Sequence, residues 1–158
     1  MPAVDKRGAE DTPLLKQYRA LKAAHPQAIL FFRLGDFYEL FDADAKAAAP
    51  LLGVVLTQRQ GLPMCGVPYH ASAHYMGKLL RQGFKIAIAD QMEDPGAATG
   101  LVRREVTRVM TPGTVVEDEL LDARSANYLA AVELDSVGWG LAVVEVSTGE
   151  FWAEQALS

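Results

Sequence analysis

A phenylalanine and a glutamate two residues apart, Phe37 and Glu39, have the types and the setting for binding chemistry. They follow the apolar run 28–34, which we expect to form a buried strand, and precede an alanine-rich stretch that ends at Leu52. We predict that a helix opens at Asp36, with Asp36 as its N-cap and Glu39 completing a capping box. A helix N-terminus often faces a ligand, because its first N–H groups lack partners and its dipole end is positive.

Helical periodicity gives Phe37 a second interpretation. At 100° per residue, Phe37 lies close to an apolar stripe that consists of Leu40, Phe41, Ala45, Ala48 and Leu52. On that interpretation Phe37 belongs to the core and Glu39 only caps the helix. Periodicity alone leaves the two interpretations open.

The other carboxylates do not form an evident catalytic or metal-binding group. Asp42 and Asp44 lie two residues apart on the predicted helix and would point to different sides, which disfavours a metal site. The histidines His25, His70 and His74 have no evident shared role. Glu145 on a predicted strand is similar to the first acid of ribonuclease-H-like nucleases, but one strand acid is more often an exposed face residue. We therefore predict no catalytic residues and no metal.

Composition limits the classes of protein to consider. With 158 residues, half of them apolar and 22% charged, the chain has room for one globular domain, or for one and part of another. The single cysteine, Cys65, excludes an internal disulfide framework and a cysteine-based zinc site, which fits a reducing cytoplasm. The sequence contains no apolar run of the ~20 residues that a membrane span requires.

Charge is unevenly distributed along the chain. Residues 1–120 are neutral in sum, so the net charge of −5 comes from residues 121–158. Basic side chains outnumber acidic ones over residues 53–110. A basic middle on a neutral domain is compatible with phosphate contacts, and equally with an ordinary solvated surface.

The pattern of elements predicts an α+β (mixed α/β) fold, a mixed sheet flanked by helices. The first helix begins with Thr12 as N-cap and Pro13 at its first position, and Gly53 ends the second. Further predicted elements are strands over 54–57, 84–89 and 102–110, a turn-rich loop after 57, and a helix over 72–82.

The predicted secondary structure changes to β-strands alone after a boundary that we place between residues 115 and 126. Strands are predicted over 127–134, 140–146 and 149–152. Two or three strands cannot form an independent core, and their edges carry unpaired backbone groups. We therefore expect residues 127–152 to pack on the first domain or to pair with another chain.

Four segments carry a specific resemblance to a known family: residues 32–41, 63–70, 88–95 and 103–114. In type, order and spacing they resemble the N-terminal part of the bacterial DNA mismatch-repair family MutS, over about residues 12–152. The resemblance implies that residues 12–118 form a mismatch-recognition, DNA-binding domain. It also implies that residues 126–158 begin an incomplete ribonuclease-H-like connector domain.

The resemblance also assigns a function to Phe37 and Glu39. It implies binding of mismatched or unpaired bases in duplex DNA, with Phe37 inserted into the minor groove and Glu39 bonded to the mispaired base. Supporting contacts to the DNA backbone fall on Arg59, Met64, His70 and Arg108. The loop over residues 59–64 is shorter than the family loop, and Cys65 stands where a small residue such as alanine is expected, so we expect it to be buried and inert.

The same resemblance implies that the remaining domains of such a protein, including the ATPase domain, lie outside this sequence. The motifs GxxxxGK[ST] and GxGxxG are absent here. We expect no enzyme and no cofactor in this chain, since ATP and magnesium serve the full-length family protein. Expected partners are DNA with mismatches or small loops, a second subunit and other repair proteins. The expected location is the bacterial cytoplasm, in association with the nucleoid. The alternatives are a protein-interaction module and a ribonuclease-H-like nuclease fragment.

Overall fold

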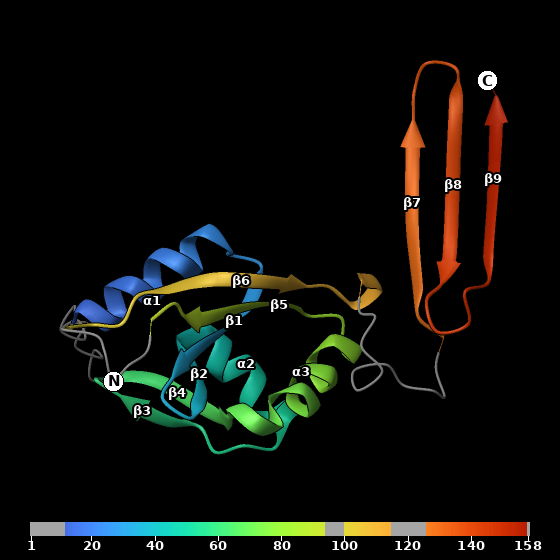
Figure 1. The fold of residues 1–158 in the computed structure, drawn as a ribbon. Coiled ribbons are helices and arrows are strands. Elements are labelled where there is room, and N and C mark those ends of the chain that lie inside the picture. The colour runs from blue at the N-terminus through green and yellow to red at the C-terminus, as the bar shows by residue number, and fades with distance from the viewer. Residues whose placement is uncertain (1–11, 94–99, 115–125, 158) are drawn as a thin grey trace, which may run out of the picture.

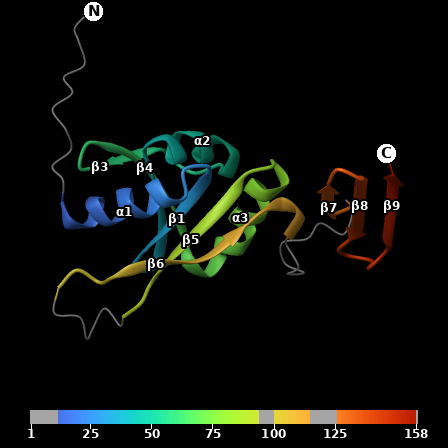
Figure 2. The same cartoon turned by 90° about the horizontal axis from the view of Figure 1, so that it is seen from above.

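The computed structural model describes residues 12–93, 100–114 and 126–157, which form two β-sheets and three α-helices (Figures 1 and 2). The elements of the first part are α1 (Pro13–Ala24), β1 (Ala28–Leu34), β2 (Phe37–Phe41), α2 (Asp42–Leu52), β3 (Thr57–Arg59), β4 (Leu62–Pro68), the 3-10 turn η1 (Tyr69–Ala71), α3 (Ser72–Arg81), β5 (Lys85–Gln91), β6 (Arg104–Met110) and the 3-10 turn η2 (Pro112–Thr114). The second part consists of β7 (Tyr128–Leu134), β8 (Gly138–Glu145) and β9 (Phe151–Leu157). The predicted α+β class is confirmed.

The first sheet is mixed, with the strand order β3-β4-β2-β1-β5-β6. β1 runs parallel to β5, and the other neighbours are antiparallel. Because side chains alternate between the faces of a strand, β1 supplies both cores. Ile29 and Phe31 pack with α2 and α3 on one face, whereas Leu30 and Phe32 pack with α1 on the other.

Several helix boundaries confirm the local signals of the sequence. The Thr12 hydroxyl accepts the N–H of Leu15 at 3.4 Å and caps α1, whose next residue is Pro13. Gly53 ends α2 in the left-handed conformation, with φ 70°. Helix α3 occupies the stretch predicted for it and is followed by Gly83, also at positive φ.

The predicted helix over residues 36–52 is wrong in its first part, because residues 37–41 form β2. Gly35 at φ 57° and Asp36 make a two-residue turn, so that β2 folds back on β1 with Phe37 opposite Leu34. Glycine at the first turn position suits the tight turns that match strand twist. Glu39 therefore lies inside a strand, the predicted capping box does not exist, and α2 begins at Asp42.

A second tight hairpin replaces the predicted turn-rich loop after residue 57. Gln60 and Gly61 both have positive φ, and Arg59 pairs with Leu62 across the turn. The strand expected over 54–57 is displaced to Thr57–Arg59, since residues 54–56 pair with no strand. Positive φ at both central residues is the conformation of a type I′ turn, whose twist matches that of the two antiparallel strands it joins.

The second sheet is antiparallel, with the order β7-β8-β9, and Figures 1 and 2 show it beside the first part rather than on it. Every residue of β7 and β9 is exposed. Tyr128 and Leu129 at the start of β7 lie beside Gly113 of η2, but in the part of the chain that the structure describes the first domain does not bury β7 or β9, as the expected packing would require. Pairing with another chain stays a prediction. The predicted boundary at 115–126 falls largely outside the described residues.

Among the described residues, no helix combines the length and the apolar character that crossing a membrane would require.

Candidate nucleic-acid interface

Strand β2 places Phe37 and Glu39 on the same face of the sheet, two residues apart. Gly66 on β4 lies opposite Glu39 in the register. A Cβ atom at Gly66 would lie 3.8 Å from Cδ1 of Phe37 and 3.9 Å from Cγ of Glu39. The two side chains therefore flank a position of the sheet that carries no side chain of its own.

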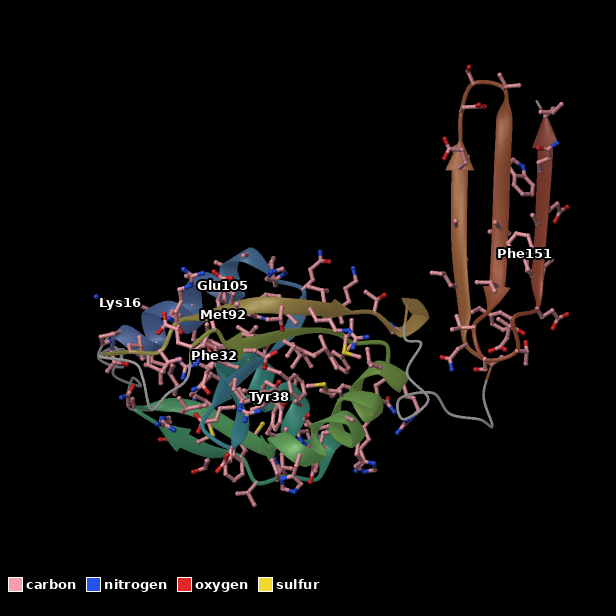
Figure 3. All side chains as sticks on the ribbon, viewed as in Figure 1. Lys16, Phe32, Tyr38, Met92, Glu105 and Phe151 are labelled. Atoms are coloured by element: carbon pink, nitrogen blue, oxygen red, sulfur yellow. The ribbon has the colours of Figure 1, made fainter. Side chains whose placement is uncertain are left out.

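The exposure of Phe37 decides between its two interpretations. Its side chain is at an outer end of β2, and the residue is 48% exposed. Tyr38, the next residue, points to the opposite face and is buried beside Phe31, within the first part of the chain in Figure 3. The interpretation of Phe37 as a core residue is wrong, because it rested on a helix where the chain forms a strand.

Glu39 is almost buried and forms an ion pair with Arg59. Arg59 Nη1 donates to the carboxylate, at 2.8 Å from Oε1 and 3.1 Å from Oε2. Burial raises the pKa of Glu39 above its ordinary value, and the positive charges of Arg59 and Arg104 offset part of that rise. No local pattern predicted this contact, since the two residues are 20 positions apart.

Arg104 is a second cation near Glu39 that the sequence did not single out. It is buried, and its guanidinium carbon lies 4.9 Å from the centre of the Phe32 ring. Its guanidinium donates to the backbone carbonyls of Arg33 and Val102. Burial lowers the pKa of Arg104, and the charge of Glu39 offsets part of that effect. The carboxylate of Glu39 is thus held in a partly buried, positive surrounding.

Two further predicted contact residues lie near this group. Met64 on β4 is opposite Phe41 and packs against the core beneath α1, so it is only partly accessible. His70 lies exposed in η1. The N–H of Tyr69 donates to the carbonyl of Asp36 at 2.8 Å, which holds η1 beside the turn that precedes Phe37.

Comparison with known sequences identifies the family. The model of MutS domain I matches residues 12–119. The chain belongs to the MutS family. The DNA mismatch repair protein MutS of Myxococcus xanthus is 52% identical over 149 residues, and the match covers 92% of this chain and 17% of that protein.

Two other relatives give the same result. The DNA mismatch repair protein MutS of Syntrophomonas wolfei is 50% identical, over 93% of this chain and 18% of that protein. That of Pseudothermotoga lettingae is 55% identical, over 88% of this chain and 17% of that protein. The chain therefore spans less than a fifth of the length of these MutS relatives.

Arg108 is set apart from the other predicted contacts in this member of the MutS family. It lies on β6, at the opposite edge of the sheet from β3, and it pairs with Ile88 of β5. Ile88 belongs to the core on the face covered by α2 and α3, which is the face away from Phe37 and Glu39. The structure does not bring Arg108 to them, and its contact with DNA stays a prediction.

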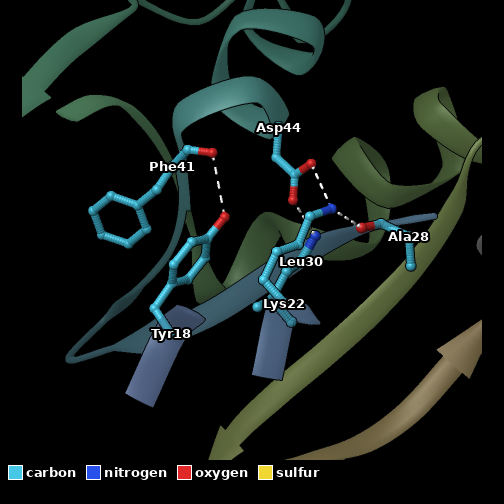
Figure 4. A network of polar contacts seen from close by, with 6 residues as sticks. All are labelled: Tyr18, Lys22, Ala28, Leu30, Phe41 and Asp44. Carbon is cyan, nitrogen blue, oxygen red and sulfur yellow. Dashed lines mark hydrogen bonds and ion pairs between the residues drawn. The ribbon is translucent and has the colours of Figure 1, made fainter. Parts of the chain in front are cut away.

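The buried carboxylate of Asp44 forms hydrogen bonds with groups of α1 and β1 in this MutS domain (Figure 4). It accepts from Lys22 Nζ at 2.8 Å and from the N–H of Leu30 at 2.9 Å. Lys22 Nζ also donates to the backbone carbonyl of Ala28 at 2.6 Å. The hydroxyl of Tyr18 donates to the backbone carbonyl of Phe41 at 3.3 Å. These bonds tie the start of α2 to α1 and β1. No cluster of three metal-binding side chains occurs in residues 12–93, 100–114 and 126–157.

Glu145 likewise has a local structural role. Its carboxylate accepts the N–H of Asn127 at 2.9 Å and the N–H of Thr148, which stabilises the turn between β8 and β9. These hydrogen bonds lower the pKa of Glu145 to about 2. A nuclease site requires further acids beside it, and the described part of the chain brings none into such a cluster.

Proposed function

We propose that residues 12–118 bind mismatched or unpaired bases in duplex DNA, with Phe37 inserted from the minor groove as an aromatic wedge. The observation that carries this proposal is a half-exposed phenylalanine at a strand end of a MutS domain I, beside a nearly buried glutamate. Apolar wedges unstack a base step and kink the duplex, at a cost of roughly a few kcal/mol. Defective pairing lowers that cost, so selectivity follows from deformability.

Glu39 supplies the polar contact to the base in this proposal. An ionised carboxylate accepts from the N3–H of thymine, whereas a bond to a purine N7 requires the protonated acid. The raised pKa of Glu39 supports the protonated form once DNA excludes water. On an intact duplex, a charged Glu39 instead repels the phosphates.

Positively charged and polar groups around Phe37 would hold the DNA backbone. Arg59 is paired with Glu39, His70 is exposed in η1, and Met64 is only partly accessible because it packs against the core. Arg108 at the far edge would meet a different part of the duplex. Contacts of this kind position the duplex and weaken with salt, and they carry no sequence information.

We assign the remaining activities to the parts of the MutS proteins beyond this chain. The domain acts as a recognition module and not as an enzyme, while ATP and magnesium are used by the ATPase domain of the full-length protein. We also propose that the full-length protein forms a homodimer and binds other repair proteins. Its proposed location is the cytoplasm, in association with the nucleoid.

A mobility-shift comparison tests the proposed function directly. A full-length MutS protein that carries this domain at its N-terminus is titrated with a duplex containing one mispair and with its matched counterpart. We expect tighter binding to the mispaired duplex. Equal affinity for both duplexes contradicts the proposal.

The second sheet supports a protein-binding role as a second candidate function. Trp139, Phe151 and Trp152 are exposed on it, and Figure 3 shows Phe151 standing on β9. Exposed aromatic groups of this size mark interaction sites in many proteins. A pull-down with residues 126–158 fused to the first domain, in the absence of DNA, tests this role.

A further inference from the structure

The turn that precedes Phe37 is held by the side chain of Arg33. Arg33 Nε donates to the carbonyl of Gly35 at 2.6 Å, so the side chain folds back over the turn. The guanidinium carbon then lies 3.3 Å from the centre of the Tyr69 ring and 5.6 Å from that of Tyr38. A planar guanidinium stacks on aromatic faces in this way, and an ammonium does not.

The backbone of η1 holds the other residue of the turn. The N–H of Tyr69 donates to the carbonyl of Asp36 at 2.8 Å. The carbonyls of both turn residues therefore have fixed partners, one from the Arg33 side chain and one from the Tyr69 backbone. Tyr69 contributes twice, because its ring also receives the guanidinium.

The base of this arrangement is anchored across the sheet. Tyr38 is the cross-strand neighbour of Arg33, and its hydroxyl donates to Asp90 Oδ1 at 2.6 Å. The hydroxyl of Thr107 on β6 donates to Asp90 Oδ2 at 2.8 Å. A chain of contacts thus runs from Thr107 on β6 through Asp90 and Tyr38 to Arg33, and Tyr38 and Arg33 lie on the face of the sheet opposite to Phe37.

We propose that Arg33 and Tyr69 are positioning residues for Phe37. Phe37 is the first residue of β2, so the turn at Gly35 and Asp36 sets the place from which its ring projects. When the turn is already fixed in the free protein, the wedge loses less conformational entropy on insertion, so the entropic cost of binding is lower. This inference rests on the proposed function of Phe37. It predicts a specific loss of mismatch binding, because the wedge is used fully only where the duplex is defective.

Arg33 could instead bind a phosphate directly, and the two roles differ in salt dependence. Loss of one phosphate contact weakens binding to all duplexes and makes the salt dependence shallower by about one released counterion. Loss of a positioning contact lowers the ratio of mismatched to matched affinity and leaves the salt dependence as it was.

The test uses a full-length MutS protein that carries this domain, with the variants Arg33→Lys, Tyr69→Leu and Tyr69→Phe. Arg33→Lys keeps the charge but removes Nε and the planar group, and Tyr69→Phe keeps the ring. We expect Arg33→Lys and Tyr69→Leu to lower the mismatch preference by about two- to tenfold. Tyr69→Phe should retain it, and the salt dependence should stay as in wild type for all three.

Amide exchange in the 158-residue chain supplies a structural measurement. Exchange of the Tyr69 amide, which donates to Asp36, should accelerate in Arg33→Lys while the melting temperature stays close to that of wild type. Unchanged exchange together with an unchanged mismatch preference overturns the inference. Arg33→Ala also removes the charge, so it tests for a phosphate contact: a salt dependence shallower than that of wild type in this variant overturns the inference in favour of that contact.

Phe37→Ala in the same full-length protein separates this inference from the function on which it rests. If wild type prefers the mispaired duplex and Phe37→Ala does not, the proposed function stands and the Arg33 variants decide the inference alone. If wild type shows no preference, the proposed function fails and the positioning role fails with it.

Discussion

Glu39 and Arg59 form an ion pair across the sheet, with Nη1 at 2.8 and 3.1 Å from the two carboxylate oxygens. They lie on β2 and β3, and β4 runs between these strands. At the level of Glu39, β4 carries Gly66, which adds no side chain to the space beside the pair. Arg59 therefore covers the carboxylate, and under the proposed function a base that bonds to Glu39 has to displace Arg59 or share the site with it.

Replacing Phe37 should remove the mismatch preference without unfolding the domain. Stacking of one base on an aromatic ring is worth about 1–3 kcal/mol, so Phe37→Ala should abolish most of the preference for mispaired DNA. The residue is half-exposed, and its loss should leave the melting temperature nearly unchanged.

Phe32 offers a matched control on the same face of the sheet. It is fully buried opposite Glu39, and Phe32→Ala should cost about 3–5 kcal/mol of stability through the cavity it leaves. Thermal melting beside a binding assay on both variants checks the contrast. A large loss of stability in Phe37→Ala would contradict the wedge role.

Glu39→Gln should tighten binding to matched DNA and so weaken discrimination. The amide donates to a purine N7 without a bound proton, and it no longer repels phosphate. It also releases Arg59 from its ion pair, which should steepen the salt dependence by about one counterion. Binding measurements on both duplexes at several salt concentrations check this. Equal weakening of both complexes would mean that Glu39 has only a structural role.

Arg59→Ala should make stability depend more strongly on pH. Burial raises the pKa of Glu39 in the folded state, so the protein is favoured while the acid is protonated and loses stability as pH rises from the ordinary carboxylate pKa to the raised one. Removal of Arg59 raises that pKa further and widens the window. Urea unfolding at a series of pH values measures the effect, and Glu39→Gln in the same background should abolish it.

The turn held by Glu145 should open in acid. Hydrogen bonds lower the pKa of Glu145 to about 2, so their contribution is complete above the ordinary glutamate pKa and is lost as pH falls towards about 2. Amide exchange at Asn127 and Thr148 should accelerate over that range. Glu145→Gln should show no such acceleration in acid. Because Glu145 has this structural role, we also expect the wild-type chain to cleave no nucleic acid when divalent metal is added.

The 158-residue chain by itself should hydrolyse no ATP, because its sequence contains no phosphate-binding loop. Its DNA affinity should be weak and should fall with salt through the few arginines available. Phosphate release and mobility-shift assays measure both properties. ATP turnover that persists through repurification, or submicromolar binding that salt does not weaken, would contradict these expectations.

The sequence by itself determined those elements whose signals are local. Thr12 followed by Pro13 begins α1, Gly53 ends α2, and the apolar runs form the central strands β1 and β5. Each depends on the conformational preference or hydrogen bonding of residues within one turn or strand. Burial of Cys65 was also predictable, and it raises the pKa of that thiol to about 11, which agrees with an inert core residue.

The tertiary structure alone decided whether residues 37–41 form a helix or a strand. Tyr38 and Leu40 enter one core and Phe41 the other, so the segment is apolar on both faces and carries no clear period of two. Pairing with β1 and β4 satisfies its backbone, and no sequence window contains both partners. The same holds for Arg59 on Glu39 and for Arg33 on Tyr69: these contacts join residues 20 and 36 positions apart, and strand register, which is a property of the assembled sheet, brings them together.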